Sequence, residues 1–298
     1  MENKIFDYLK NYYEILSLKR YPRFKELKEE KINECYKILE SCQLCEWKCK
    51  VNRYENFGRC MIKNEMLISS YFSHYGEEFF FIPSFTIFFF SCNFGCVFCQ
   101  NYGISHRLEI PLVIKPKELA NIININAKEC KNINLVGGEP TPQLPFILET
   151  LKNVKINKPI IWNSNFYFSL KAFNFIKDIT DVYLPDFKYG NDECAFRLSK
   201  VKNYTKIIKR NLLLAKKDKK ADIVIRHLVL PGHIDCCSKP IIDFIAKNLK
   251  EKAIINIMAQ YIPYFKAYKF KEISKPLTKK EFNEVIDYAI QKEICFIT

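Results

Sequence analysis

The sequence of 298 residues contains no apolar run that is long enough to span a bilayer. Its most apolar stretch, FFFIPSFTIFFFSC, is interrupted by Pro83 and ends in cysteines, which favours a buried strand over a membrane helix. The amino-terminal segment, MENKIFDYLKNYYEILSLKRYPRF, is charged and lacks the apolar core of a signal peptide. We therefore expect a protein of the cytoplasm that has no membrane partner.

Internal repeats and low-complexity linkers are also absent, and glycine occurs only eight times. Hydrophobic residues make up 48% of the chain, which is enough for a large core and argues against disorder. The length is about twice that of a typical domain, but it also fits a single α/β barrel.

The net charge of +14 arises from 47 Lys and Arg against 33 Asp and Glu. Nucleic acid would be one partner for such a chain, but the lysines are spread along the whole sequence. We interpret them as a solvated surface whose positive field favours the approach of an acidic protein or an anionic cofactor. A nucleic-acid partner is therefore not expected.

Cysteine is abundant, with 13 residues, and a reducing cytoplasm favours metal ligation over a disulfide framework. Two groups show ligand spacing, namely Cys42, Cys45, Cys49 and Cys60 in the first and Cys92, Cys96 and Cys99 in the second. Six others lack it, and we expect them to be small buried hydrophobic residues: Cys35, Cys130, Cys194, Cys236, Cys237 and Cys295. Adjacent side chains point in different directions in most backbones, so Cys236 and Cys237 receive no joint role. His233 follows a Pro-Gly turn and is expected to be exposed.

Residues 1–41 are predicted to form two helices, and residues 42–83 a cysteine-rich, metal-binding extension. From residue 84 to 298 strand and helix patterns alternate, with six strands in SFTIFFFS, NINLV, PIIWN, DVYLP, ADIVIRHLVL and AIINIMAQY. This alternation predicts an α/β fold with a parallel sheet, which can be a full barrel, a partial barrel or an open doubly wound sheet.

Residues able to do chemistry fall just after the ends of these strands, at Cys92–Cys99, Gly137–Pro140, Asn163–Asn165 and Asp186–Lys188, or near the end of the strand, at Arg226–His227. Active sites of barrels and open α/β sheets collect at the carboxyl ends of the strands. Five successive loops are therefore expected to converge on one site.

The spacing C-x3-C-x2-C of Cys92, Cys96 and Cys99 provides three thiolates, which are soft ligands for zinc, copper(I) or iron–sulfur clusters. A four-iron cluster normally takes four cysteines, so three leave one iron without a protein ligand and open to chemistry. Gly95 lies inside this loop, where we expect it to permit a tight turn. One strand later, Gly137-Gly138-Glu139-Pro140 offers a close backbone approach and a carboxylate for an ammonium group.

These motifs resemble those of the radical S-adenosylmethionine (SAM) superfamily. Its signature, C-x3-C-x-aromatic-C, is matched with Phe98 in the aromatic position, and its GGE motif is matched by Gly137, Gly138 and Glu139. The branch of pyruvate formate-lyase activating enzyme, with its activase-like proteins of uncertain substrate, is similar in CNFGCVFCQNYGIS, YLPDFKYG, RHLVLPG, QYIPYFKAY and the leader CQLCEWKCKVNRYENFGRC. The resemblance covers residues 40–290 and implies a partial (β/α)6 TIM-like barrel with an N-terminal helical and cysteine-rich extension.

The resemblance implies that Cys92, Cys96 and Cys99 hold a [4Fe–4S] cluster whose open iron binds the amino and carboxylate groups of SAM. It also implies contacts to SAM from Phe98, Gly137, Gly138, Glu139, Ser164, Asp186 and Arg226. In this set Glu139 would bind the ammonium, the backbone at Phe98 would touch the adenine, and Arg226 would lie near the carboxylate and ribose. Asn163 stands where activating enzymes carry an acid, so the sequence departs from them at that turn.

The implied reaction is the reductive cleavage of SAM to methionine and a 5′-deoxyadenosyl radical, with one electron from an external donor of the ferredoxin or flavodoxin type. The radical would abstract hydrogen from a substrate, and family analogy suggests a glycyl radical enzyme. A small molecule or another peptide stays open as the substrate, and no catalytic residue of the chain is assigned. A non-catalytic metal- or nucleic-acid-binding protein is the alternative from another class, but it leaves Gly137–Glu139 without a role.

The first cysteine group has the spacing C-x2-C-x3-C-x10-C and provides a closed set of four ligands. Such a set suits structural zinc or an auxiliary iron–sulfur cluster. We favour the iron–sulfur cluster slightly, because the protein already depends on cluster assembly. A nucleic-acid zinc finger is disfavoured, since the segment lacks histidine ligands and a following basic recognition helix.

Overall fold

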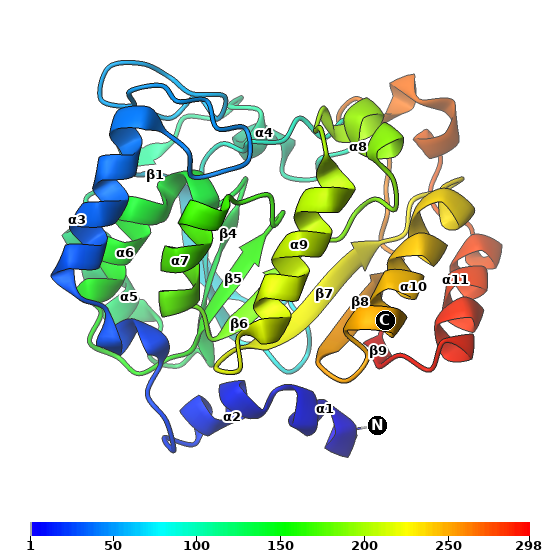
Figure 1. The fold of residues 1–298 in the computed structure, drawn as a ribbon, viewed down its shortest axis with the longest axis horizontal. Coiled ribbons are helices and arrows are strands. Elements are labelled where there is room, and N and C mark those ends of the chain that lie inside the picture. Colours follow the sequence, from blue (N-terminus) through cyan, green and yellow to red (C-terminus); the bar gives the residue numbers. More distant parts are fainter. Residues whose placement is uncertain (1) are drawn as a thin grey trace.

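A nine-stranded sheet with the strand order β3-β1-β2-β4-β5-β6-β7-β8-β9 forms the centre of the protein in the computed structural model, which describes residues 2–298 (Figure 1). The strands are β1 (Leu67–His74), β2 (Ser84–Phe89), β3 (Leu112–Val113), β4 (Asn132–Gly137), β5 (Ile160–Ser164), β6 (Val182–Pro185), β7 (Asp222–Leu228), β8 (Ala253–Met258) and β9 (Phe296–Ile297). From β2 to β9, leaving out β3, each strand pairs in parallel with the next, whereas β1 is antiparallel to both β2 and β3. The six predicted strands are β2 and β4 to β8, and the partial TIM-like α/β barrel is confirmed.

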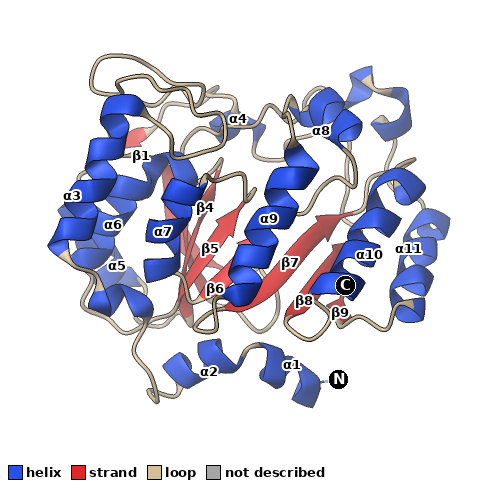
Figure 2. Cartoon of the chain, in the orientation of Figure 1, coloured by secondary structure: helices blue, strands red, loops and turns tan. Residues whose placement is uncertain are grey.

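Helices cover the outer face of this sheet, as Figure 2 shows. They are α5 (Pro116–Asn126), α6 (Leu144–Lys152), α7 (Leu170–Ile179), α9 (Tyr204–Lys217), α10 (Lys239–Asn248) and α11 (Lys279–Gln291), whereas the short α4 (Tyr102–Ser105) and α8 (Asp192–Ser199) lie at the carboxyl ends of the strands. Local sequence fixes several helix starts, because the side chains of Ser169 and Thr278 cap α7 and α11 by accepting backbone N–H bonds. Apolar residues at helical spacing turn one face of each long helix to the sheet, so both faces of the central strands are buried.

The amino-terminal segment forms three α-helices, α1 (Glu2–Tyr8), α2 (Lys10–Leu16) and α3 (Glu29–Lys37), and two 3-10 helices (Arg23–Glu26 and Ile38–Ser41), where two helices were predicted. The extra break falls at Leu9, whose backbone leaves the helical region. α1 and α2 lie below the amino ends of the strands (Figure 1). Their apolar residues pack with Phe80 and Phe81 against residues inside the barrel, such as Val182, and form a second core. The N-terminal helices therefore close the floor of the barrel.

β1 lies within the predicted extension of residues 42–83 and pairs with β2 along its length. That part of the extension is an integral strand of the sheet. Among residues 2–298, no helix combines the length and the apolar character needed to cross a membrane.

Candidate functional site

A cavity opens at the carboxyl ends of the parallel strands, where five loops were predicted to meet. Its lining includes Cys92, Cys96, Phe98, Cys99, Gly137, Gly138, Asn163, Asn165, Asp186, Lys188, Arg226 and Met258. The structure therefore brings together most of the residues that the sequence motifs singled out. Glu139 and Ser164 do not line the cavity in the described chain and lie behind its wall.

The three cysteines of the loop after β2 form one side of the cavity. The Cys92 Sγ accepts a bond from the backbone N–H of Phe94 at 3.3 Å, and the Cys96 Sγ accepts one from Ser199 Oγ at 2.9 Å. Burial raises the pKa of the Cys92 thiol well above its usual range, and the nearby Glu139 carboxylate adds to this shift. Burial also raises the pKa of the Cys96 thiol to about 11. Thiols held in this way ionise at neutral pH when a bound cation compensates their charge, as in metal sites.

Two glycines let the end of β4 approach the base of the cysteine loop. Gly137 has a φ of +122°, and a Cβ there would lie 2.3 Å from the backbone N of Phe89. A Cβ on Gly138 would lie 1.9 Å from the carbonyl O of Ser91. Any other residue would force these two strand ends apart.

Gly95 does not have the role that we predicted. Among the described glycines a positive φ occurs only at Gly137 and Gly232, and a Cβ on Gly95 would meet its nearest neighbour, the Lys200 side chain, at 3.6 Å. The chain turns instead at Ser91, which has a φ of 70° and directly precedes the first cysteine. The prediction that the loop requires glycine at this position is therefore wrong.

Glu139 is fully buried behind the cavity wall. Its carboxylate accepts bonds from the backbone N and Oγ1 of Thr141, from Ser164 Oγ at 2.7 Å and from the backbone N of Asn165 at 2.9 Å. Burial raises the pKa of Glu139, although these donors oppose the shift. The carboxylate thus joins the loops that follow β4 and β5, and its contact with an ammonium group, like that of Ser164 with SAM, stays a prediction.

Three polar residues of the cavity were not among the predicted SAM contacts. The Nδ2 of Asn163 is buried and has no hydrogen-bond partner within residues 2–298. Asn165 donates to Asn93 Oδ1 at 2.7 Å. Lys188 donates to Asp186 Oδ2 at 2.7 Å, and although burial lowers its pKa, Asp186 and the nearby thiols outweigh burial and raise it. Their position at or just beyond the carboxyl ends of β5 and β6 was the available signal.

Arg226 lies inside the barrel, where its charge is balanced by two carboxylates from the loop after β1. Its Nε and Nη2 donate to Glu78 at 2.8 Å, and Nη2 also donates to Glu77. Asn256 donates to the same Glu78 carboxylate, at 2.9 Å. Both acids are buried, so their role is to hold the guanidinium that lines the cavity rather than to act as an acid/base pair.

The cysteines of the N-terminal group come from the loop between α3 and β1. Burial raises the pKa of both Cys45 and Cys60. The Cys42 thiol is near enough to both for its charge to add to this rise in pKa, and Cys60 adds to the pKa of Cys45, and Cys49 to that of Cys60, in the same way. The structure therefore gathers the four predicted ligands into one region.

The N-terminal group is fastened to the cavity wall by buried hydrogen bonds. Arg53 is fully buried and donates to the carbonyl oxygens of Ile62, Lys63 and Pro142, the last of which follows the GGE motif. Trp47 Nε1 donates to the carbonyl O of Asn93 at 2.8 Å. Because Asn93 follows Cys92 directly, this hydrogen bond joins the segment of the N-terminal group to the cysteine loop of the cavity.

A third group of potential ligands, Cys194, His233, Cys236 and Cys237, was not predicted. His233 was expected to be exposed, but its exposed fraction is 3%, and its ring contacts three of the cysteines that were given no ligand role. The available signal was the spacing H-x2-C-C, since residues three and four apart share one face of a helical turn. Cys194 could not have been added from the sequence, because it lies 39 residues before His233.

His227 is a buried histidine near the carboxyl end of β7. Its Nδ1 donates to the carbonyl O of Phe187 and its Nε2 accepts from Ser238 Oγ, both at 2.9 Å. Burial lowers its pKa from 6.5 to about 4, so its contribution to stability is complete above pH 6.5 and is lost as the pH falls through 4. We expect this loss to reach about 3 kcal/mol of unfolding free energy. The measurement is the unfolding free energy from urea titrations at several pH values between 4 and 6.5. In His227→Gln this free energy should change less with pH than in the wild type. An equal pH dependence in the two proteins would contradict the conclusion that His227 is neutral in the folded state.

Comparison with known proteins agrees with this geometry. The family model of the radical SAM superfamily matches residues 86–245. An uncharacterized protein of Methanocaldococcus jannaschii is 47% identical over 265 residues, which cover 87% of this chain and 77% of the relative.

Among solved structures, SuiB of Streptococcus suis bound to S-adenosylmethionine matches with a TM-score of 0.52 and 18% identity, over 70% of this chain and 48% of SuiB. SuiB bound to the precursor peptide SuiA matches with a TM-score of 0.51 and 16% identity, over 70% of this chain and 47% of that one. A radical SAM methyltransferase from Sphaerobacter thermophilus matches with a TM-score of 0.51 and 10% identity, over 72% and 66%. The chain spans about half the length of SuiB, and at these identities the likeness shows the fold alone. Because the family model covers more than half of the sequence, the chain belongs to the radical SAM superfamily, whose cofactors are a [4Fe–4S] cluster and S-adenosylmethionine.

Proposed function

We propose that Cys92, Cys96 and Cys99 hold the [4Fe–4S] cluster and that the adjoining cavity binds SAM. The donor set fits these groups, because three half-buried cysteines line one cavity and no fourth cysteine lines it among the described residues. Asn163 lines the same cavity, and its Nδ2 is buried without a hydrogen-bond partner among the described residues, so a small movement of this side chain would let it donate to an oxygen of SAM. This combination of three thiols and an unpaired buried amide is the observation that carries the proposal.

Held by Cys92, Cys96 and Cys99, the cluster would supply an electron from the external donor for the reductive cleavage of SAM, and SAM would supply the radical that abstracts hydrogen from the substrate. The chain itself provides position, charge and exclusion of water. Asn163 donates to the bound SAM, and the backbones of Gly137, Gly138 and Phe98 allow it to approach closely. Glu139 and Ser164 hold the loops in place, and they reach the ammonium only if those loops rearrange.

The charged groups of the cavity prepare it for a zwitterionic ligand. Lys188 and Asp186 form an ion pair beside the cysteine loop, and Arg226 lies near them with its charge balanced by Glu77 and Glu78. Such fixed charges are oriented before the ligand arrives, so they need little reorganisation. We propose that Asp186 and Arg226 contact the ribose and carboxylate of SAM, with Lys188 keeping the field near the thiolates positive.

We propose a protein as the substrate, and by analogy with activating enzymes a glycine of a glycyl radical enzyme. A groove lined by Ser69, Ser70, Phe72, Phe88 and residues of 100–109 adjoins the cavity and shares Gln100 and Asn101 with it. Exposed apolar side chains flank this groove and form an edge patch: Phe72, Tyr102, Leu108, Ile110, Leu112 and Val113. An apolar patch beside a reactive cavity favours a protein partner over a small molecule.

The position of this patch at the edge of the sheet adds support for an extended segment of the substrate. β3 is the terminal strand of the sheet, so one side of its backbone has no strand neighbour in the described sheet. Edge strands accept extended peptides by main-chain hydrogen bonds. A loop of a partner protein could therefore be aligned along β3 with its reactive residue at the cavity mouth.

An external one-electron donor is required by radical SAM enzymes, and we propose a small acidic protein of the ferredoxin or flavodoxin type. The net charge of +14 favours the approach of such a partner. For the N-terminal cysteine group we propose an auxiliary iron–sulfur cluster, with structural zinc as the second candidate. Its position against the cysteine loop of the cavity would suit a relay of electrons toward the first cluster.

Anaerobic reconstitution followed by reduction and addition of SAM tests the class of reaction. We expect 5′-deoxyadenosine and methionine to form, even without a substrate. A protein that carries a complete iron–sulfur spectrum but forms neither product would contradict the proposal. Adding a glycyl radical enzyme of the pyruvate formate-lyase type should then give an organic radical signal in electron paramagnetic resonance, and SAM cleavage without that signal would reject this substrate alone.

The edge patch can be tested separately from the chemistry. In the double variant Leu108→Glu/Ile110→Glu we expect substrate-free SAM cleavage to be unchanged and hydrogen abstraction from the protein substrate to fall about tenfold or more. Leu18→Glu/Tyr21→Glu places the same charge on two exposed residues of the N-terminal segment and serves as the matched control. Equal rates in the patch variant and the control would remove the patch from the substrate site.

A further inference from the structure

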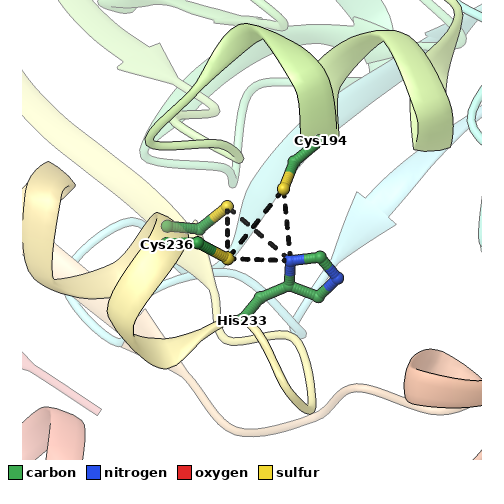
Figure 3. A group of neighbouring side chains, drawn as sticks. Cys194, His233 and Cys236 are labelled. Carbon is green, nitrogen blue, oxygen red and sulfur yellow. Dashed lines mark hydrogen bonds between the residues drawn. The ribbon is translucent and has the colours of Figure 1, made fainter.

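Four side chains converge on one point beside the loop that follows β7. Figure 3 shows Cys194, His233 and Cys236 pointing toward one another, and the sulfur of Cys237 belongs to the same group. Their ligand atoms all lie within 4.8 Å of one another. Cys194, His233 and Cys237 are buried, whereas Cys236 lies at the surface and leaves an entry path for an ion.

The separations match those of a tetrahedral metal site. The Nδ1 of His233 lies 3.4 Å from the Cys194 sulfur, 3.2 Å from that of Cys236 and 3.9 Å from that of Cys237. The Cys236 sulfur lies 3.9 Å from those of Cys194 and Cys237. Zinc at about 2.3 Å from sulfur and about 2.0 Å from nitrogen, with tetrahedral angles, places its ligands about 3.5 to 3.8 Å apart.

We propose that Cys194, His233, Cys236 and Cys237 bind a structural zinc ion. Soft thiolates with one imidazole are ligands that zinc prefers, and a Cys3His set fills all four tetrahedral positions. A closed site leaves no position for a reacting ligand, so the ion stabilises the fold rather than taking part in the chemistry of the cavity. This site is distinct from both predicted cysteine sites and shares no residue with them.

The surroundings of the histidine support metal ligation through Nδ1. Its other ring nitrogen, Nε2, lies 3.8 Å from Glu272 Oε1, and Glu272 is in turn paired with Arg197, whose Nη2 lies 3.5 Å from Nε2. Histidines that bind metals usually turn their second nitrogen toward a carboxylate, which fixes the ring and its tautomer. Three thiolates and zinc carry a net charge of −1, and the neighbouring Arg197 and Glu272 form an ion pair that is neutral overall.

The local structure is built to bring these ligands together. His233 precedes a turn of π-helix, Ile234–Ser238, that carries Cys236 and Cys237, and such turns are frequent at functional sites. Cys194 lies in the first turn of α8, whose cap residue Asn191 donates to the Cys194 sulfur at 3.3 Å and to the carbonyl O of Cys236 at 2.8 Å. Hydrogen bonds from Asn191 therefore already hold the segment of Cys194 against the segment of Cys236.

Gly190 permits the contact between these loops, because a Cβ there would lie 2.7 Å from the carbonyl O of Cys236. At its other end α8 supports the cysteine loop of the cavity, since the carbonyl O of Ser199 accepts from the backbone N of Gly95 and Ser199 Oγ donates to the Cys96 sulfur. A zinc ion at Cys194 would fix the start of the helix whose end supports Cys96. The proposed ion thus braces one wall of the cavity.

Metal analysis tests the proposal without any measurement of activity. Zinc and iron per chain are measured by mass spectrometry in the full-length protein and in Cys194→Ser/Cys236→Ser, both purified from cells supplied with zinc and reconstituted with iron and sulfide. We expect the variant to lose about one zinc equivalent and no iron. Cys130→Ser, a buried cysteine outside the three groups, is the matched control and should retain all metal.

If the double variant does not fold, zinc and iron per chain are measured in the single variant Cys236→Ser, in which the substituted residue is exposed. Zinc X-ray absorption should show sulfur near 2.3 Å and nitrogen near 2.0 Å in the wild type, and the nitrogen contribution should disappear in His233→Ala. A four-sulfur zinc site at Cys42–Cys60 would give no nitrogen contribution. Unchanged zinc in the cysteine variants, loss of iron in place of zinc, or a disulfide between Cys194 and Cys236 in the purified wild type would each overturn the proposal.

Discussion

Replacement of Cys96 by alanine is expected to lower SAM cleavage by a factor of about 10³ or more, while the N-terminal cysteine group keeps its metal. Cys96 is one of only three proposed protein ligands to the cluster, so its loss leaves two irons without a thiolate. The remaining cysteines, Cys92 and Cys99, are half-buried, and the desolvation of their thiols raises the pKa of both, so they are poor ligands unless a cluster compensates their charge. The measurement is 5′-deoxyadenosine formation together with iron and sulfide content.

Cys96 is the suitable member of the three for this experiment. Its sulfur accepts a hydrogen bond from Ser199 on α8, whereas Cys92 directly precedes Asn93, whose carbonyl O accepts from Trp47 of the N-terminal group. Cys130→Ala removes a buried thiol elsewhere and should leave cleavage unchanged. Loss of all metal in Cys96→Ala would contradict the separation into two sites.

The arrangement of the cavity could be predicted because its parts follow local rules. Cys92, Cys96 and Cys99 lie within one loop, so their spacing alone places three thiols together. Residues at the carboxyl ends of parallel strands meet at one edge of a sheet. This rule predicted that Asp186, just after β6, and Arg226, near the end of β7, would lie at the same site. The strands themselves were recognisable because those of a parallel sheet are buried on both faces and read as continuous apolar runs.

What could not be predicted depends on contacts between distant segments. The hydrogen bonds from Ser164 and Asn165 to Glu139 join two segments that are 25 and 26 residues apart. No sequence spacing shows that the Glu139 carboxylate accepts its hydrogen bonds from within the chain. Cys194 meets His233 only after two loops pack together through Gly190. Glu139 was predicted to bind a ligand and is instead bonded within the chain, whereas Cys194 was given no ligand role and lies among potential ligands. In both cases contacts made only in the folded protein determine the surroundings of the residue.

The second large effect is expected at Gly138, where alanine should lower SAM cleavage by about 100-fold, because a displacement of about 1 Å in a reacting group has this consequence. A Cβ at Gly138 would lie 1.9 Å from the Ser91 carbonyl O, a backbone atom that cannot rotate away, so the base of the cysteine loop must shift. Gly95→Ala is the matched comparison inside the same loop, since its Cβ would meet nothing closer than 3.6 Å, and we expect its cleavage rate to stay within about threefold of the wild type. Both variants would be measured for iron content and for 5′-deoxyadenosine formation under identical reconstitution. If Gly95→Ala lost activity and Gly138→Ala kept it, the loop would be controlled by its own turn rather than by its contact with β4.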